Sequence, residues 1–151
     1  MRVVAGRYGG RRLTAPRGRA TRPTSDRVRE ALFSMLGDVH QMRVLDLFAG
    51  TGALAIEALS RGAQSAVLVE RDERALAALH ANLEALGLGG EQVRVLAMDA
   101  ATALQTARAR RETYDLIFID PPYQQAPEYS TRLQTALTGL LAPAARVVVE
   151  S

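Results

Sequence analysis

Hydrophobic and polar positions follow two different periods along most of this chain. From residue 42 onward, short apolar runs alternate with longer stretches in which apolar residues recur every three or four positions. The short runs predict buried strands and the longer stretches predict helices with one buried face. We expect strands at 43–47, 65–70, 93–98, 114–119 and 146–150. We expect helices at 52–60, 72–86, 100–109 and 128–141, and Gly62 and Gly87 lie where helix C-caps are common.

Alternation of strands and helices with short connections is typical of parallel strands joined by right-handed crossovers. The predicted fold class is therefore α/β, with a doubly wound, mostly parallel sheet that is covered on both faces.

The first forty residues have another pattern. Segments 3–5 and 12–14 flank a turn at Gly9-Gly10, which predicts a short β-hairpin with a basic tip, followed by an irregular connector at 16–19. Residues 24–26 supply N-cap candidates for a helix that ends at Gly37. We expect two units, a hairpin and connector at 1–24 and an α/β domain at 25–151.

Composition limits the possible classes of protein. With 151 residues, 48% of them hydrophobic, the chain is long and apolar enough for one globular domain. The absence of cysteine excludes disulfides and thiol chemistry. No apolar stretch approaches the length of a membrane span or of a signal-peptide core, so we expect a cytoplasmic protein. His40 and His80 are isolated, and no metal is expected.

Positive charge is concentrated at the start of the chain. Residues 1–29 contain nine arginines and one acid, a net charge of +8, whereas the whole chain carries +3. A basic segment on an acidic body predicts a polyanionic partner such as RNA. All 19 basic residues are arginine, for which codon bias is a sufficient explanation.

The tetrapeptide Asp120-Pro121-Pro122-Tyr123 follows the predicted strand 114–119. In open α/β sheets, ligands bind at the carboxyl ends of the strands. A carboxylate, a carbonyl and an aromatic ring held by two stiff prolines suit a planar base that carries an exocyclic amine. An ordinary strand-ending turn is the alternative interpretation.

A second candidate site joins the first strand of the α/β domain to its helix. Gly50 and Gly52 allow the backbone to pass close to a ligand, and Glu70 and Asp99 end the next two strands. Each acid alone is equally typical of a surface residue or a helix cap. The glycine pattern is incomplete for a nicotinamide dinucleotide and lacks the lysine of a nucleoside triphosphate loop. S-adenosylmethionine, which has an adenosine but no phosphates, fits better.

Five stretches of the chain resemble one known family, the bacterial 16S ribosomal RNA guanine-N2 methyltransferases. They are 21–33, 44–54, 57–63, 69–72 and 115–123. The resemblance implies a Rossmann-like methyltransferase domain at 25–151, S-adenosylmethionine as cofactor, and methylation of a guanine amine in an assembling small ribosomal subunit. The partner would be 16S rRNA in that subunit or in an assembly intermediate, with no membrane involved.

The resemblance also implies roles for individual residues. Catalysis is assigned to Asp120, Pro121, Pro122 and Tyr123. Cofactor binding is assigned to Asp46, Phe48, Ala49, Gly50, Thr51, Gly52, Glu70, Arg71, Asp99 and Ala100. Substrate binding is assigned to Arg7, Arg11, Arg12, Arg22 and Thr24.

One feature departs from the family, whose sheet has seven strands with an antiparallel pair at one edge. This sequence stops at Ser151, just after the fifth predicted strand. The C-terminal strands are therefore expected to be missing, with lower stability or with self-association of an otherwise monomeric protein through an open edge.

Two other functions remain open at this point. An adenine-N6 methyltransferase acting on DNA or RNA would share the Asp-Pro-Pro-Tyr motif. A noncatalytic RNA-binding assembly factor would share the fold, although it would have little reason to retain Asp120, Gly50 and Gly52.

Overall fold

The computed structural model describes residues 1–15, 25–122 and 127–149. Its helices are α1 (Asp26–Leu36), α2 (Ala53–Ser60), α3 (Glu73–Ala85), α4 (Ala100–Ala109) and α5 (Pro127–Ala136). Its strands are β1 (Arg43–Asp46), β2 (Ser65–Val69), β3 (Val93–Leu96), β4 (Tyr114–Ile119) and β5 (Leu141–Val149). The predicted alternation of strands and helices is confirmed.

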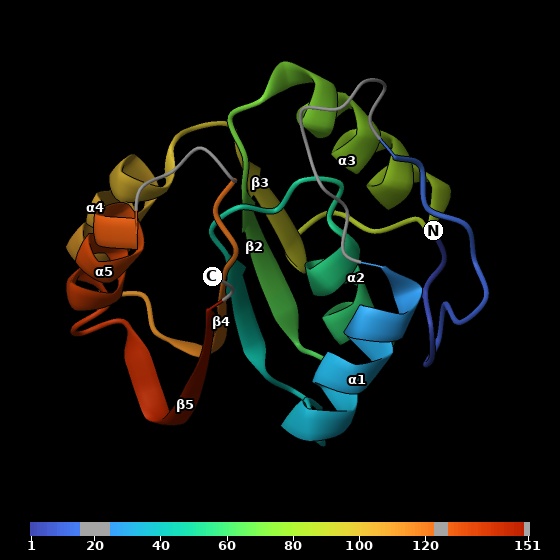
Figure 1. Cartoon of the computed structure of the whole chain (residues 1–151), viewed down its shortest axis with the longest axis horizontal. Helices are drawn as coiled ribbons and strands as arrows, with labels where there is room; N and C mark the ends of the chain where they lie inside the picture. The colour runs from blue at the N-terminus through green and yellow to red at the C-terminus, as the bar shows by residue number, and fades with distance from the viewer. Residues whose placement is uncertain (16–24, 123–126, 150–151) are drawn as a thin grey trace.

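The five strands form one parallel sheet in the order β3-β2-β1-β4-β5. Helices α1, α2 and α3 lie on one face of this sheet, and α4 and α5 lie on the other (Figure 1). Successive residues of a strand therefore enter different cores: Val44 packs with the first helix layer and Leu45 with the second. Burial on both faces explains why the strands are apolar at nearly every position.

Helix starts are set by short polar side chains. The N-caps Ser25, Asp72 and Asp99 each accept a hydrogen bond from the backbone N–H three residues later. Ser25 is thus the cap among the three candidates at 24–26. Gly37, Gly62 and Gly87 follow helices and have positive φ angles of 73°, 106° and 68°, as predicted for residues at helix ends.

The chain differs from the prediction between α5 and β5. Helix α5 ends at Ala136, five residues before the predicted end, and β5 begins at Leu141 instead of Arg146. Gly139, with φ of 90°, stops the helix in a turn. Tyr114 pairs with Leu141, but Leu116 pairs with Arg146, so a bulge interrupts β5. The uninterrupted part of the β4–β5 pairing therefore starts where the strand was predicted.

Residues 1–15, called the arm below, contain one antiparallel bridge, between Arg2 and Arg12. Three main-chain hydrogen bonds cross the arm beside it, from Leu13 N–H to the Met1 carbonyl, from Val3 N–H to the Arg11 carbonyl and from Gly10 N–H to the Val3 carbonyl. The N–H groups of Val4 and Ala5 donate to the Glu57 carboxylate of α2, at 2.8 and 3.1 Å. A regular β-hairpin stays a prediction.

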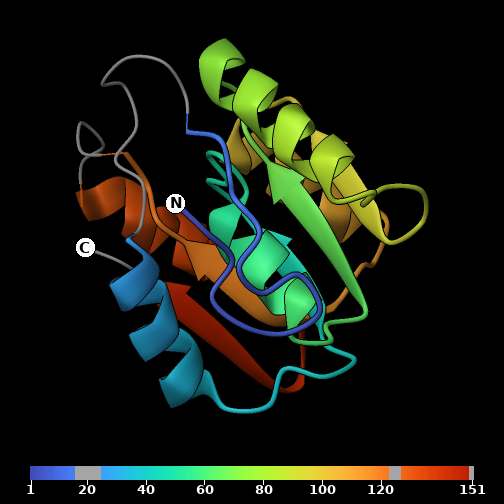
Figure 2. The ribbon, with the colours of Figure 1, turned by 90° about the vertical axis from the view of Figure 1, so that its right-hand side faces the viewer.

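The arm lies across α2 and beside α1 (Figure 2). Buried polar side chains of these two helices hold it there. Glu57 is fully buried and also receives the Arg61 Nε at 2.9 Å. Ser60 donates to the Ala5 carbonyl, and the fully buried Arg29 donates to the Arg2 carbonyl. Because Val3 and Leu13 of the arm also belong to the core, the arm is packed on the α/β body. The division of the chain into 1–24 and 25–151 stays a prediction.

The expectation of missing C-terminal strands also stays a prediction. Within the described residues, β5 pairs with β4 alone, and Val149 at its end is 39% exposed. None of the helices in this part of the chain is long and apolar enough to cross a membrane.

We predict that Glu57→Ala lowers the free energy of unfolding by about 3–5 kcal/mol, because it leaves buried arginine and amide groups without their acceptor. Urea unfolding of the variant measures this loss. Glu84→Ala, at an exposed position of α3, is the matched control and should change stability by about 0.5 kcal/mol or less. An equal effect of both substitutions would contradict the role given to Glu57.

Candidate active site

Three carboxylates gather at the carboxyl edge of the sheet. Asp46 ends β1, Glu70 follows β2 and Asp120 follows β4. Since β2, β1 and β4 are neighbours and parallel, these ends lie side by side. The chain order reverses between β1 and β4, and such a switch point is where open α/β sheets bind ligands. The structure thus brings Asp46 and Asp120 together at the expected place.

Asp46 carries the strongest electrostatic signal of the described residues. Its side chain is buried, Oδ1 accepts a hydrogen bond from the Phe48 N–H at 3.3 Å, and Oδ2 has no partner within the described parts of the chain. Burial, with smaller contributions from the negative charges of Asp120 and Glu70, raises the pKa of Asp46 to about 7, against the hydrogen bond from Phe48. A buried, unpaired acceptor in a site is suited to a cationic ligand group.

The two glycines of the loop between β1 and α2 have different roles. Both have positive φ angles, 57° at Gly50 and 87° at Gly52. A Cβ on Gly50 would meet nothing within 4 Å, whereas a Cβ on Gly52 would lie 2.5 Å from Leu79 Cδ1. Gly50 therefore leaves open space beside the loop, and Gly52 is needed for packing against α3. That both glycines serve a ligand stays a prediction.

Glu70 fixes the open side of this loop. Its Oε1 accepts a hydrogen bond from the Gly50 N–H at 2.8 Å. Its Oε2 accepts from the backbone N–H groups of Arg71 and Asp72, at 3.0 and 2.9 Å. The carboxylate therefore joins the end of β2 to the glycine loop and still has lone pairs for a ligand hydroxyl.

The other residues predicted to bind the cofactor lie at the start of α4, in the glycine loop and after β2. Asp99 caps α4, and the hydrogen bond from the Thr102 N–H holds the pKa of Asp99 below its usual range. Ala100 is the first, buried residue of α4, and Ala49 and Thr51 are buried in the glycine loop. The Arg71 side chain is exposed. Asp99 is thus a helix cap, which was the alternative to a role in binding a ligand. It lies at the border of the site.

Asp120 lines a mostly apolar pocket between α1 and the sheet. The other residues of its wall are Val28, Leu32, Leu54, Phe118, Ile119 and Val148. Pro121 is half-buried and Pro122 is exposed at the same edge. Tyr123 lies outside the described residues. The described part of the motif therefore offers a carboxylate and proline carbonyls beside an apolar wall.

Three of the predicted substrate arginines, Arg7, Arg11 and Arg12, lie on the arm. Arg7 stacks over the Tyr8 ring at 5.5 Å, and Arg12 is exposed. Arg11 donates to the Ala85 carbonyl at the end of α3, so its side chain also holds the arm in place. Arg22 and Thr24 lie outside the described residues.

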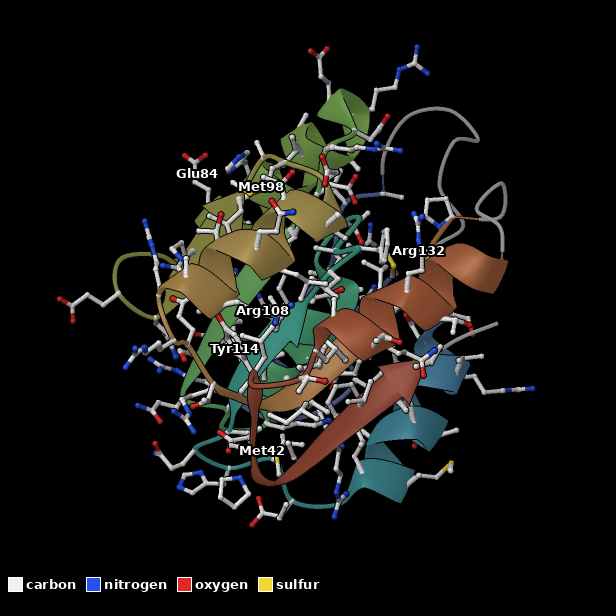
Figure 3. All side chains as sticks on the ribbon, turned by 90° about the vertical axis from the view of Figure 1, so that its left-hand side faces the viewer. Met42, Glu84, Met98, Arg108, Tyr114 and Arg132 are labelled. Carbon is white, nitrogen blue, oxygen red and sulfur yellow. The ribbon has the colours of Figure 1, made fainter. Side chains whose placement is uncertain are left out.

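Sequence reasoning missed Asn82 of α3, which hydrogen-bonds both the arm and the glycine loop. Its signal was a polar residue on an apolar helix face, since Ala75, Ala78, Leu79 and Leu83 around it are buried. Arg108 of α4 and Arg132 of α5 were not predicted either. They line a groove on the opposite face of the sheet from the arm (Figure 3).

Comparison with known proteins decides the family. All residues, 1–151, match the family described as "Conserved hypothetical protein 95". The chain belongs to this family. It is 39% identical to "Ribosomal RNA small subunit methyltransferase D" of Escherichia coli K12, over the whole chain and 74% of that protein. It is 44% identical to "Putative rRNA methyltransferase YlbH" of Bacillus subtilis, over 83% of the chain and 68% of that protein.

Solved structures of similar proteins share the fold. "Putative methyltransferase yhhF" from Escherichia coli matches with a TM-score of 0.83 and 36% identity, over 99% of this chain and 79% of that one. "SMU.776, a putative methyltransferase complexed with SAH" matches with a TM-score of 0.70 and 26% identity, over 82% of this chain and 34% of that one. The fold is the Rossmann-like fold of S-adenosylmethionine-dependent methyltransferases, and the cofactor of this family member is S-adenosylmethionine.

We predict that Asp46→Asn stabilises the protein above neutral pH. The folded pKa of about 7 lies above the value of 3.8 for the free carboxyl, so ionisation costs the wild type stability as pH rises through this interval. At pH 8 the variant should be about 2–4 kcal/mol more stable than the wild type, and at pH 4 the difference should nearly vanish. Urea unfolding at both values measures it.

The same variant should bind S-adenosylmethionine at least about tenfold more weakly, since it lacks the carboxylate charge. Gain of stability with loss of affinity identifies a ligand-binding carboxylate. A variant that is destabilised at pH 8 would show that the Asp46 carboxylate is structural.

Proposed function

We propose that this protein transfers a methyl group from S-adenosylmethionine to the exocyclic N2 amine of a guanine in 16S rRNA. One observation carries the proposal: Asp120 and its prolines border the switch point of the sheet, next to the strand whose end holds Asp46 and the glycine loop. A motif suited to binding an exocyclic amine is thus adjacent to the glycine loop, which is proposed to bind the cofactor. The small-subunit rRNA methyltransferase from Escherichia coli supplies the substrate class.

The residues present fit the cofactor. The free Oδ2 of Asp46 would accept from the ammonium of the methionine part, and the space beside Gly50 leaves room for it. Phe48, Ala49, Thr51 and Gly52 would complete this wall. Glu70 would bind the ribose hydroxyls, with Arg71 beside it, and Asp99 and Ala100 would contact adenine. When bound, the cofactor supplies an electrophilic methyl group on a sulfonium.

Asp120 would position and activate the amine. The lone pair of a guanine amine is delocalised into the ring, which makes the nitrogen a poor nucleophile. The Asp120 carboxylate and the Pro121 carbonyl would accept hydrogen bonds from the two amine protons, which favours a more tetrahedral nitrogen and frees its lone pair. Pro122 stiffens the loop and Tyr123 would stack on the base. After transfer, the amine proton would leave to water.

The arm would bind the RNA. Arg7 and Arg12 expose positive charge on it, and Arg11, Arg22 and Thr24 complete the predicted substrate contacts. The guanine must leave its stack to reach Asp120, which costs least in a loop or single-stranded region. We propose that the substrate is a small subunit or its assembly intermediate, so the protein would act in the cytoplasm.

We predict that Asp120→Ala reduces methyl transfer at least about a hundredfold and leaves cofactor affinity within about threefold of the wild type. The assay uses labelled S-adenosylmethionine and small subunits that lack N2-methylguanosine, followed by digestion to nucleosides. Asp115→Ala is the matched control and should retain transfer, since Asp115 lies in β4, the strand that precedes Asp120, and its carboxylate bonds Arg43.

Label in N6-methyladenosine would replace the proposal with the adenine alternative. Absence of label from the wild type, with cofactor bound, would favour the noncatalytic assembly factor. Equal loss of transfer and cofactor affinity in Asp120→Ala would make the loop structural.

We predict that Arg12→Ala weakens binding to different RNA sequences by a similar factor and lowers the slope of log affinity against log salt by about one. The reason is that an exposed arginine neutralises a phosphate without reading a base. Filter binding between low and moderate salt measures the slope, with Arg110→Ala, exposed at the end of α4, as control. An unchanged slope in Arg12→Ala would place the RNA surface elsewhere.

A further inference from the structure

Asn82 of α3 joins two parts of the molecule that the proposed function uses separately. Its side chain is 2% exposed. Its Oδ1 accepts a hydrogen bond from the Thr14 N–H of the arm at 2.6 Å, and its Nδ2 donates to the Thr14 carbonyl at 3.0 Å. The second Nδ2 proton goes to the Thr51 carbonyl of the glycine loop at 2.9 Å. One amide group thus bonds the arm and the loop simultaneously.

On the loop side, Asn82 reaches a rigid segment. Thr51 lies between the two glycines and is 6% exposed. Gly52 is in contact with Leu79, which lies three residues before Asn82 on α3. On the opposite side, the Gly50 N–H is held by Glu70. The loop is therefore held between Glu70 and helix α3. A shift of the Asn82 amide would change the hydrogen bond that holds the loop on the α3 side.

On the arm side, a second contact reaches the same helix. Arg11 donates to the Ala85 carbonyl at 2.8 Å, three residues beyond Asn82. The arm therefore contacts the last turn of α3 at Asn82 and at Ala85, and the Asn82 side chain links it to Thr51. The groups that orient the Asn82 amide thus belong to the arm and to the glycine loop.

We propose that Asn82 is a positioning residue that couples RNA binding by the arm to cofactor binding by the glycine loop. This inference rests on the proposed function, since it takes the arm as an RNA contact. RNA that holds the arm in its bonded position favours the Asn82 orientation that holds the Thr51 carbonyl, and so favours the loop shape that receives the cofactor. Linkage is reciprocal, so the cofactor tightens RNA binding by the same factor.

The test measures the dissociation constant of labelled S-adenosylhomocysteine, which cannot react, with and without saturating unmethylated small subunits. In the wild type we expect the subunits to tighten its binding about fivefold or more. In Asn82→Ala this factor should fall to about one. The dissociation constant measured without subunits should change by a smaller factor than the coupling that is lost. His80→Ala, exposed on the same helix, should keep the wild-type factor.

A second variant covers the case in which Asn82→Ala does not fold. Asn82→Asp keeps an acceptor for the Thr14 N–H but, as a carboxylate, has no proton for the Thr14 or Thr51 carbonyl. The contacts of the arm with Glu57, Ser60 and Ala85 should keep it attached, while the coupling should be lost. In each variant, S-adenosylhomocysteine must change the affinity for small subunits by the same factor by which the subunits change the affinity for S-adenosylhomocysteine, because linkage is reciprocal.

A wild-type factor in either folded Asn82 variant would overturn the inference. So would a wild type whose affinity for S-adenosylhomocysteine does not respond to small subunits. If that wild type still methylates the subunits, the proposed function stands and the coupling alone fails. If it neither binds nor methylates them, both fail.

Discussion

The parallel direction of the five strands is the constraint on which the candidate site depends. It brings the ends of β2, β1 and β4 to one edge and with them three carboxylates, one of which, Asp46, is buried with one oxygen that has no partner among the described residues. Mutual repulsion and burial make this edge unfavourable in the free protein, as the raised pKa of Asp46 indicates. A cationic ligand at Asp46, as proposed for the cofactor, would offset both costs.

A second system of buried polar groups connects the basic arm to this edge. Arg29, Glu57, Ser60 and Asn82 are buried, and each hydrogen-bonds main-chain atoms of the arm. Their cost of burial is offset by these bonds, because the arm supplies the partners that water would otherwise supply. The segment proposed to hold RNA is thus part of the folded body and has a defined position relative to the glycine loop.

Local pattern was sufficient for the elements and for the placement of the acids. Apolar runs located the strands, and their alternation with helices implied a parallel sheet, which places Asp46, Glu70 and Asp120 at one edge. Predictions from the local sequence pattern were incomplete where a residue distant in the chain, or a turn close by, determined the structure. The turn at Gly139 ended α5 although apolar spacing continued, and the Glu57 carboxylate holds Val4 of the arm from 53 positions away in the chain.

The contacts of Asn82 could not be predicted, because they join residues 31 and 68 positions apart in the chain. Periodicity places Asn82 on the buried face of α3 but does not identify its partners. The same limit applies to Gly52, whose need for glycine comes from Leu79 and becomes visible only in the packed structure.

The way in which the arm is attached has a consequence for divergence among related proteins. Glu57, Ser60 and Asn82 bind backbone N–H and carbonyl groups of the arm, and these groups are present whatever side chains the arm carries. Exposed arm residues other than Gly6, where a Cβ would meet Ser60, and Arg11, whose side chain bonds the Ala85 carbonyl, are therefore nearly free to change while the attachment is kept. A scaffold of this kind can acquire new surface chemistry, by natural drift or by design, without being refolded around it.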